Sequence, residues 1–157
     1  MDGIKGKDLY NKGSSEVREI ASLTKIMTAY VSLQLAKELN LDLYKKFFTV
    51  SEAASLIPGT SASLRSVQRV KIFDLIHALM LPSGNDAALT LAENFGEHII
   101  RARGIKTVPN RAKLSTPNPE KLRENRADPQ IVSRINNPLS IFVKEMNKTA
   151  VSGFHLK

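Results

Sequence analysis

Two short stretches of this chain carry side chains that could together perform acyl transfer. The first is Ser22-Leu23-Thr24-Lys25, in which a hydroxyl and an amine stand three positions apart. On a helix that begins at Ser22, both side chains lie on one face about a turn apart. The helix N-terminus favours an alkoxide over a nearby ammonium ion, and burial also favours the neutral amine. Ser22 is therefore a candidate nucleophile, and Lys25 is a candidate base for it.

The second stretch is Ser83-Gly84-Asn85, which follows a helical apolar pattern. Pro82 disfavours helical geometry at the residue before it and should end the helix predicted over 72–81. Gly84 allows a tight turn, and Asn85 is a plausible cap for the next helix, for which Gly96 is a candidate stop. Ser83 and Asn85 should therefore project from a short loop held between two packed helices.

Both stretches also have a purely structural interpretation. Serine is a favoured N-cap, so Ser22 could cap a helix whose first turn exposes Lys25. Ser83 and Asn85 could equally satisfy backbone groups at a helix–turn–helix corner. What favours the chemical interpretation is that the sequence has no other Ser-x-x-Lys and no other Ser-x-Asn, and that these two occur in this order.

The elements that must hold these residues are mainly helical. Apolar residues between Ile26 and Leu39 leave hardly any continuous polar face, a pattern typical of a helix buried within a domain. An irregular or hairpin region is expected around Ser63 to Val70. The helices are predicted over 22–40, 51–57, 72–81, 86–100 and 138–152.

The sequence resembles the D-alanyl-D-alanine carboxypeptidases, which are low-molecular-mass penicillin-binding proteins. The likeness is carried by the segments 18–30 and 79–88, by 48–54 and 70–75 between them, and more weakly by 137–146. It implies an α+β fold, the β-lactamase/transpeptidase-like domain, here mainly as its helical part with an incomplete antiparallel sheet. It implies D-Ala-D-Ala peptides and β-lactams as ligands, and no cofactor or metal.

The resemblance also assigns roles to the four candidate residues. Ser22 would attack the substrate carbonyl and become acylated, and Lys25 would be its general base. Ser83 would pass a proton toward the leaving amine, and Asn85 would hold the substrate amide. The family's third motif, Lys-Thr-Gly, is absent from these 157 residues. In the family, the strand that carries this motif supplies half of the oxyanion hole, so we expect feeble activity from the chain by itself.

Two segments resemble the missing motif without matching it. Lys148-Thr149-Ala150 lies in a predicted helix, and Lys106-Thr107-Val108 lies in a basic stretch with proline. Both lack the glycine that lets a strand approach a substrate closely. Neither is therefore expected to replace the third motif.

Composition sets wider limits. One domain is expected for 157 residues, of which 42% are hydrophobic, and the absence of cysteine excludes disulfides and thiol catalysis. The three histidines are too scattered for a metal site. No run reaches transmembrane length and Met1-Asp2-Gly3 opens no signal peptide, so the location stays open although the family is extracytoplasmic.

The chain is expected to form a single partial domain with four parts. These are a remnant of an N-terminal hairpin (1–21), a helical core with both motifs (22–100), a basic polar insertion (101–136) and a C-terminal helix leading into further strands (137–157). From 99 to 136 the sequence has nine basic and three acidic residues, within a net charge of +8. The segment 101–134 could contact an anionic polymer, but it lacks aromatic residues for specific nucleic-acid binding.

Two alternatives to an active carboxypeptidase follow from these features. The missing third motif allows a non-catalytic relic or a module that binds an anionic polymer. A serine β-lactamase is the other alternative. It is disfavoured because Gly84 stands where class A enzymes have Asp, and because no Glu-x-x-Leu-Asn deacylation motif is present.

Overall fold

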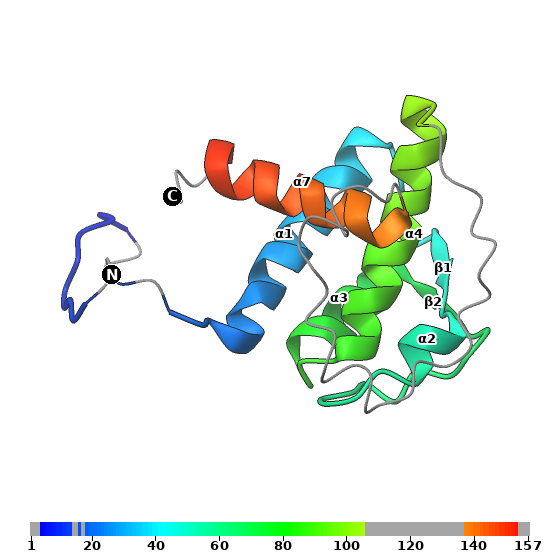
Figure 1. The fold of residues 1–157 in the computed structure, drawn as a ribbon, viewed down its shortest axis with the longest axis horizontal. Coiled ribbons are helices and arrows are strands. Elements are labelled where there is room, and N and C mark those ends of the chain that lie inside the picture. Colours follow the sequence, from blue (N-terminus) through cyan, green and yellow to red (C-terminus); the bar gives the residue numbers. More distant parts are fainter. Residues whose placement is uncertain (1–3, 14–15, 17, 106–136, 154–157) are drawn as a thin grey trace.

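The computed structural model describes residues 4–13, 16, 18–105 and 137–153, and all structural statements below concern these residues. They form a cluster of helices with one small antiparallel sheet at its side (Figure 1). The elements, in chain order, are η1 (Ala21–Leu23), α1 (Thr24–Glu38), β1 (Phe47–Thr49), α2 (Glu52–Ser55), β2 (Arg69–Lys71), α3 (Ile72–Met80), α4 (Asn85–Arg103) and α7 (Pro138–Gly153). The expected α+β class, mainly helical with a small sheet, is confirmed.

Helix α4 lies at the centre of the cluster, and its apolar face forms much of the core. Phe95 of this helix packs edge-on against Phe48 of β1, with ring centroids 4.9 Å apart. On its other side Phe95 stacks with Phe142 of α7 at 6.3 Å. All three rings are at most 1% exposed, so the core joins the sheet, α4 and α7 through aromatic contacts.

Gly96 does not end α4, so its prediction as a stop is wrong, whereas the predicted range 86–100 correctly runs past it. The helix continues to Arg103, and Gly104 in the left-handed conformation (φ 60°) follows it as a C-terminal glycine commonly does. Gly96 instead lies where α4 and α7 cross, because a Cβ there would be 1.9 Å from the carbonyl oxygen of Pro138. Glycine at this position reflects close helix approach, which a local pattern cannot distinguish from a stop.

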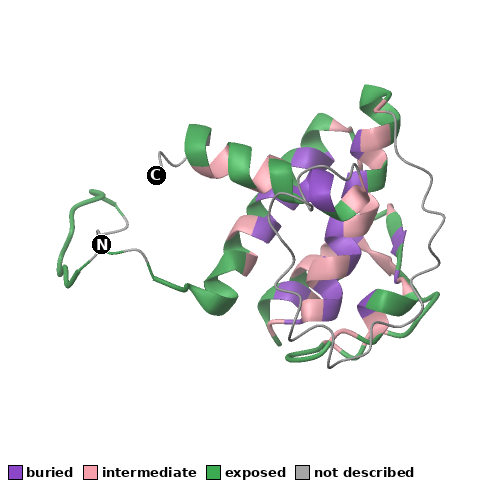
Figure 2. Cartoon of the chain, in the orientation of Figure 1, coloured by how far each residue is buried: buried purple, intermediate pink, exposed green. Residues whose placement is uncertain are grey.

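Helix α1 packs against the other helices along one face only. Helices α3, α4 and α7 all contact it, and its buried residues are Thr28, Ala29, Val31, Ser32, Leu35 and Ala36. On the opposite face Ile26, Tyr30 and Leu33 are 56%, 38% and 44% exposed (Figure 2). The expectation that the whole helix is buried is therefore wrong for this face, because no described element covers it.

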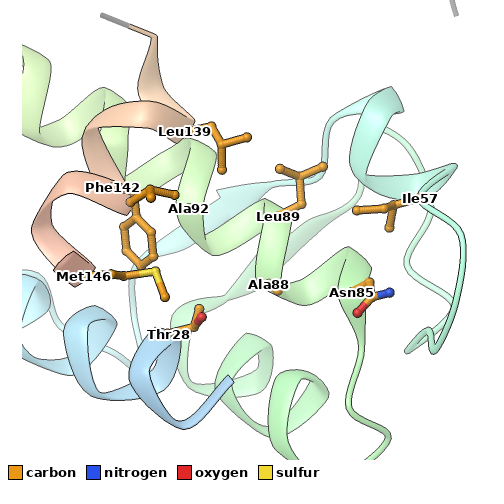
Figure 3. A pocket seen from close by; sticks show the side chains of 10 residues that line it. Thr28, Ile57, Asn85, Ala88, Leu89, Ala92, Leu139, Phe142 and Met146 are labelled. Carbon is orange, nitrogen blue, oxygen red and sulfur yellow. The ribbon is translucent and has the colours of Figure 1, made fainter. Parts of the chain in front are cut away.

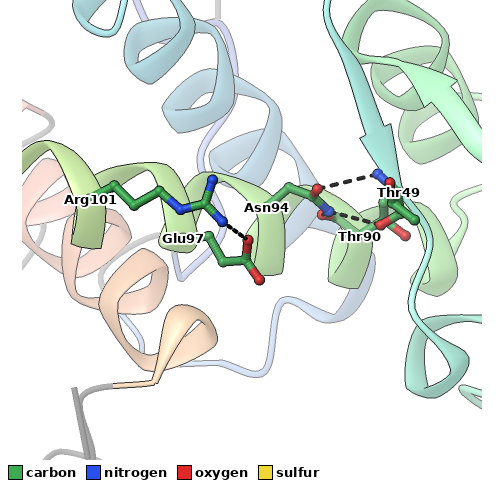
Figure 4. A network of polar contacts seen from close by, with 5 residues as sticks. All are labelled: Thr49, Thr90, Asn94, Glu97 and Arg101. Atoms are coloured by element: carbon green, nitrogen blue, oxygen red, sulfur yellow. Dashed lines mark hydrogen bonds and ion pairs between the residues drawn. The ribbon is translucent and has the colours of Figure 1, made fainter. Parts of the chain in front are cut away.

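Strands β1 and β2 pair antiparallel, with Phe48 opposite Val70. The region around 63–70 thus contributes to one strand, β2, whose partner comes from residues 47–49, where the sequence predicts no element. The free edge of β1 is closed by Asn94 of α4, whose side chain accepts from the Thr49 N–H and donates to the Thr49 carbonyl (Figure 4). These two bonds replace a third strand and attach the sheet to α4.

The remaining expectations concern the ends and the insertion. Residues 4–13 are exposed and contain neither helix nor strand, and they lie away from the helices (Figure 1). In the basic insertion, Arg101 and Arg103 belong to α4, and the part from 106 to 136 lies outside the described residues. Of the two segments that resemble Lys-Thr-Gly, 148–150 lie within α7, as expected, and 106–108 lie outside the described residues.

Candidate active site

The Lys25 amine lies between the two predicted motifs. Its Nζ donates to Oδ1 of Asn85 at 2.8 Å and lies 3.4 Å from Oγ of Ser22. Ser22 comes from η1, Lys25 from the first turn of α1, and Asn85 from the first turn of α4. The structure therefore brings Ser22, Lys25 and Asn85 together, although Lys25 and Asn85 are 60 residues apart in sequence.

Ser22 occupies a short 3₁₀ turn rather than the α-helix itself. Residues 21–23 form this turn, and α1 begins at Thr24, so the predicted helix start at Ser22 is two residues early. Ser22 is solvent-exposed and Lys25 is half-buried. The distance between Ser22 Oγ and Lys25 Nζ is long for a hydrogen bond, as is common in active sites before a substrate is bound.

The Ser83 loop is held in an unusual conformation. Ser83 has φ 57°, a value uncommon for a residue with a side chain, and its carbonyl accepts from the Thr60 hydroxyl at 2.5 Å. Ala21, directly before Ser22, has φ 45°. Such conformations typically cost about 1–3 kcal/mol each and cluster at functional sites, so strain adjoins both motifs.

The Ser83 hydroxyl is not hydrogen-bonded to the other three candidate groups, Ser22, Lys25 and Asn85, in the described part of the chain. The backbone carbonyl of Ser83 is instead engaged by Thr60. Ser83 therefore lies in the loop predicted for it, but its direct contact with the amine stays a prediction.

Asn85 is not the cap expected from sequence. Gly84 precedes the helix as its N-cap, and Asn85 is the first helical residue. The Asn85 side chain points outward to two other segments: Nδ2 donates to the Pro58 carbonyl at 2.8 Å, and Oδ1 accepts from Lys25. Capping was the local expectation, but tertiary partners use both ends of the amide instead.

Asp86 is the residue that sequence reasoning missed. It is 1% exposed, and its carboxylate accepts from the Ser61 hydroxyl and from the backbone N–H groups of Ala62, Leu64 and Ala87. Burial acts to raise the pKa of Asp86, but these hydrogen bonds outweigh burial and hold the pKa below its usual value. An acid in the first turn of a helix is ordinary, so no sequence signal indicated its burial.

An apolar pocket of about 300 Å³ begins at Asn85 and runs along α4. Asn85 and Ile57 lie at one end, and Phe142 and Met146 of α7 lie at the other (Figure 3). Thr28, one turn after Lys25 on α1, also lines it. No group of three or more metal-ligating side chains occurs in the described ranges. No helix in those ranges is long and apolar enough to cross a membrane.

Residues 1–98 match the sequence model of a peptidase family described as D-alanyl-D-alanine carboxypeptidase. The chain belongs to this family. The match includes all four residues predicted for the site, so the family resemblance read from the two motifs is confirmed. The residue roles within the D-alanyl-D-alanine carboxypeptidase family remain predictions for this chain.

Several curated D-alanyl-D-alanine carboxypeptidases are similar to the chain. DacF of Bacillus subtilis is 33% identical over 88 residues, covering 56% of this chain and 22% of DacF. The enzyme of Streptomyces sp. (strain K15) is 34% identical over 122 residues, covering 75% of this chain and 40% of the relative. DacC of Escherichia coli is 35% identical over 99 residues, covering 59% and 24%. The chain thus spans less than half the length of each.

A solved structure supports the same fold. The crystal structure of the D-alanyl-D-alanine carboxypeptidase DacD from Francisella tularensis has a TM-score of 0.53 to this chain at 22% identity. The alignment covers 96% of this chain and 35% of DacD. The helices and small sheet described above therefore have the arrangement of one part of a carboxypeptidase domain.

Proposed function

We propose that the chain carries part of a serine-type D-Ala-D-Ala carboxypeptidase site that cleaves peptides through an acyl-enzyme. The observation that supports this most directly is the position of Lys25. Its Nζ is 2.8 Å from Asn85 Oδ1 and 3.4 Å from Ser22 Oγ, so one amine contacts both motifs of the family. Family membership supplies the reaction class, and the geometry supplies a base within reach of a hydroxyl.

In the proposed acylation, the Lys25 amine takes the proton of Ser22. Ser22 Oγ attacks the carbonyl of the penultimate D-Ala, and the C–N bond to the terminal D-Ala breaks. The amine of the terminal D-Ala leaves with the proton that Lys25 took from Ser22, which Ser83 delivers to it. Water then hydrolyses the ester and releases the shortened peptide. Asn85 holds the substrate amide, and the backbone N–H of Ser22 is one donor of the oxyanion hole.

Asn85 also has a second role in the proposed site, through its hydrogen bond to Lys25. Because Asn85 Oδ1 accepts one N–H of Lys25, it restrains rotation of the amine about its last bond. An amine held in this way stays within reach of Ser22. Loss of the Asn85 side chain should therefore slow acylation as well as weaken substrate binding.

Mass spectrometry after incubation with a penicillin tests the proposal. A lasting mass increase, mapped to Ser22 and absent from a Ser22→Ala variant, is the expected result. The matched control is Ser66→Ala, which changes an exposed serine and should leave labelling intact. No adduct on the unaltered chain would leave the non-catalytic alternative, and rapid release of hydrolysed penicillin would favour a β-lactamase.

No described contact favours the alternative of an anionic-polymer module. The two basic residues of the 101–134 segment that the structure describes already have acidic partners: Arg101 pairs with Glu97, and Arg103 pairs with Glu38 and Glu145. This alternative can be tested by salt-dependent retention on an anionic matrix. Weaker retention of a variant lacking residues 106–134 than of the whole chain would support it.

A further inference from the structure

We propose that Asp86 is a positioning residue, which orients the Asn85 amide toward Lys25 through the segment 58–64, here called the strap. The inference rests on the proposed function, because it concerns how one part of that site is held. Asp86 itself touches neither Ser22 nor Lys25 by any described hydrogen bond. Its effect passes through the strap.

The carboxylate of Asp86 binds the strap at three residues, Ser61, Ala62 and Leu64. Oδ2 accepts from the Ser61 hydroxyl at 2.7 Å, from the Ala62 N–H at 3.0 Å and from the Leu64 N–H at 3.0 Å. Oδ1 also accepts from the Ala62 N–H at 3.0 Å. Hydrogen bonds to an ionised group are stronger than neutral ones, so this carboxylate is the main polar anchor of the strap.

The strap in turn binds Asn85 on two sides. The Thr60 carbonyl accepts from the Asn85 backbone N–H at 2.7 Å, and the Pro58 carbonyl accepts from Asn85 Nδ2 at 2.8 Å. A carbonyl can only accept, so its partner must be the NH₂ end of the amide. The oxygen end of Asn85 is thereby directed away from the strap and toward Lys25, where it accepts at 2.8 Å.

The strap has no regular secondary structure that could hold it in place by itself. It contains two residues with positive φ, Gly59 at 99° and Ser63 at 59°. A Cβ at Gly59 would lie 2.6 Å from Asn85 Nδ2, so the strap backbone is in direct contact with the amide. Movement of the strap therefore moves the Pro58 and Thr60 carbonyls and releases the Asn85 side chain.

The test compares Asp86→Asn with Ile99→Ala, a substitution at an equally buried position (1% exposed) near the other end of α4. Asp86→Asn places an NH₂ group against backbone N–H donors and removes the charge. We expect it to slow penicillin acylation of the folded protein at least tenfold, whereas Ile99→Ala should lower stability without changing that rate. Wild-type acylation by folded Asp86→Asn protein would overturn the proposal.

A second variant covers the case in which Asp86→Asn does not fold. Ser61→Ala removes one donor to Asp86 and the acceptor of the Ser63 N–H, from an exposed position, and leaves the carboxylate in place. We expect acylation to slow by about threefold. If this variant reacted at the wild-type rate, while Asp86→Asn failed to fold, the carboxylate would have only a structural role and the proposal would fall.

A readout independent of acylation separates this proposal from the proposed function. The side-chain NH₂ of Asn85 and its backbone N–H can be followed by NMR hydrogen exchange. In folded Asp86→Asn or Ser61→Ala protein both should exchange at least tenfold faster, but not in Ile99→Ala. Suppose that penicillin does not acylate the wild-type protein, but that the two Asn85 groups exchange faster in the Asp86 or Ser61 variants. The proposed carboxypeptidase function then fails, and the positioning role of Asp86 stands. If the exchange of these groups is unchanged, the positioning role fails.

Discussion

Substituting Gly96 by alanine should weaken the packing of α7 on α4. An added Cβ would lie 1.9 Å from the Pro138 carbonyl oxygen, 2.4 Å from its carbon and 2.6 Å from its Cα. Real Cβ contacts are essentially never shorter than 3.0 Å, so the two backbones must separate by about 1.1 Å. Because the obstructing atoms belong to the main chain, no side-chain rotation can relieve the contact.

The expected cost follows from the contacts that such a separation disturbs. The Phe95–Phe142 stack and the buried Ile141 lie at this interface, and a gap of 0.5–1 Å forfeits a quarter to a half of each dispersion contact. Overpacking typically costs about 1–3 kcal/mol and can exceed that range against backbone, while replacing glycine within a helix returns roughly 1 kcal/mol. We expect a net loss of about 2 kcal/mol.

Urea unfolding followed by circular dichroism measures this loss, and the thermal midpoint should fall by about 4–8 °C for a chain of this size. Amide exchange should show α7 losing protection before α3 and α4. The control is Glu97→Ala, which adds an alanine at the next, exposed position and should change stability by about 0.5 kcal/mol or less. A Gly96→Ala protein as stable as the wild type would refute the close-crossing argument.

Three further predictions concern charges. Burial raises the pKa of Glu93, so the folded state favours its protonated form. Glu93→Gln should therefore raise the free energy of unfolding, measured in urea, by about 0.5 kcal/mol at pH 7 and leave it unchanged at pH 3. The pKa of Asp86 is instead lowered in the folded state by its hydrogen bonds. Its ionised form therefore stabilises the fold above pH 3.8, and this contribution to the free energy of unfolding is lost as the pH falls further. Acid unfolding should show this loss in the wild type and not in Asp86→Asn. Arg103→Gln should cost about 1 kcal/mol, since it leaves Glu145 half-buried without its partner, whereas Arg101→Gln breaks an exposed pair and should cost about 0.3 kcal/mol by the same unfolding assay.

Local sequence signals predicted most of the helices well. The pattern around Leu75 and Leu79 gave a helix over 72–81, and the structure has α3 over Ile72–Met80, ending just before Pro82. The helix predicted over 138–152 is α7 at Pro138–Gly153. These elements were predictable because apolar periodicity and proline act within a few residues of where they stand.

Signals with two physical meanings give wrong predictions. The sequence predicts Gly96 as a helix stop, but Gly96 permits a close helix crossing; it predicts Asn85 as a cap, but Asn85 binds Lys25 and the strap. Residues 47–49 were not predicted as a strand, because a three-residue strand gives little periodic pattern and depends on its pairing with 69–71. In each case the partner is distant in sequence.

The amino-acid sequence alone determined the family and the pair of motifs that define the candidate site. Residue type, order and flanking sequence predict the four candidates Ser22, Lys25, Ser83 and Asn85. The family match confirms the resemblance carried by the segments that contain them. The tertiary structure decided which of them meet: Lys25 reaches Ser22 and Asn85, while the Ser83 hydroxyl forms no described bond to either. It also decided that a buried Asp86 anchors the strap. The physical reason is that a motif fixes chemistry along the chain, whereas distance, burial and hydrogen-bond direction depend on how separate elements pack.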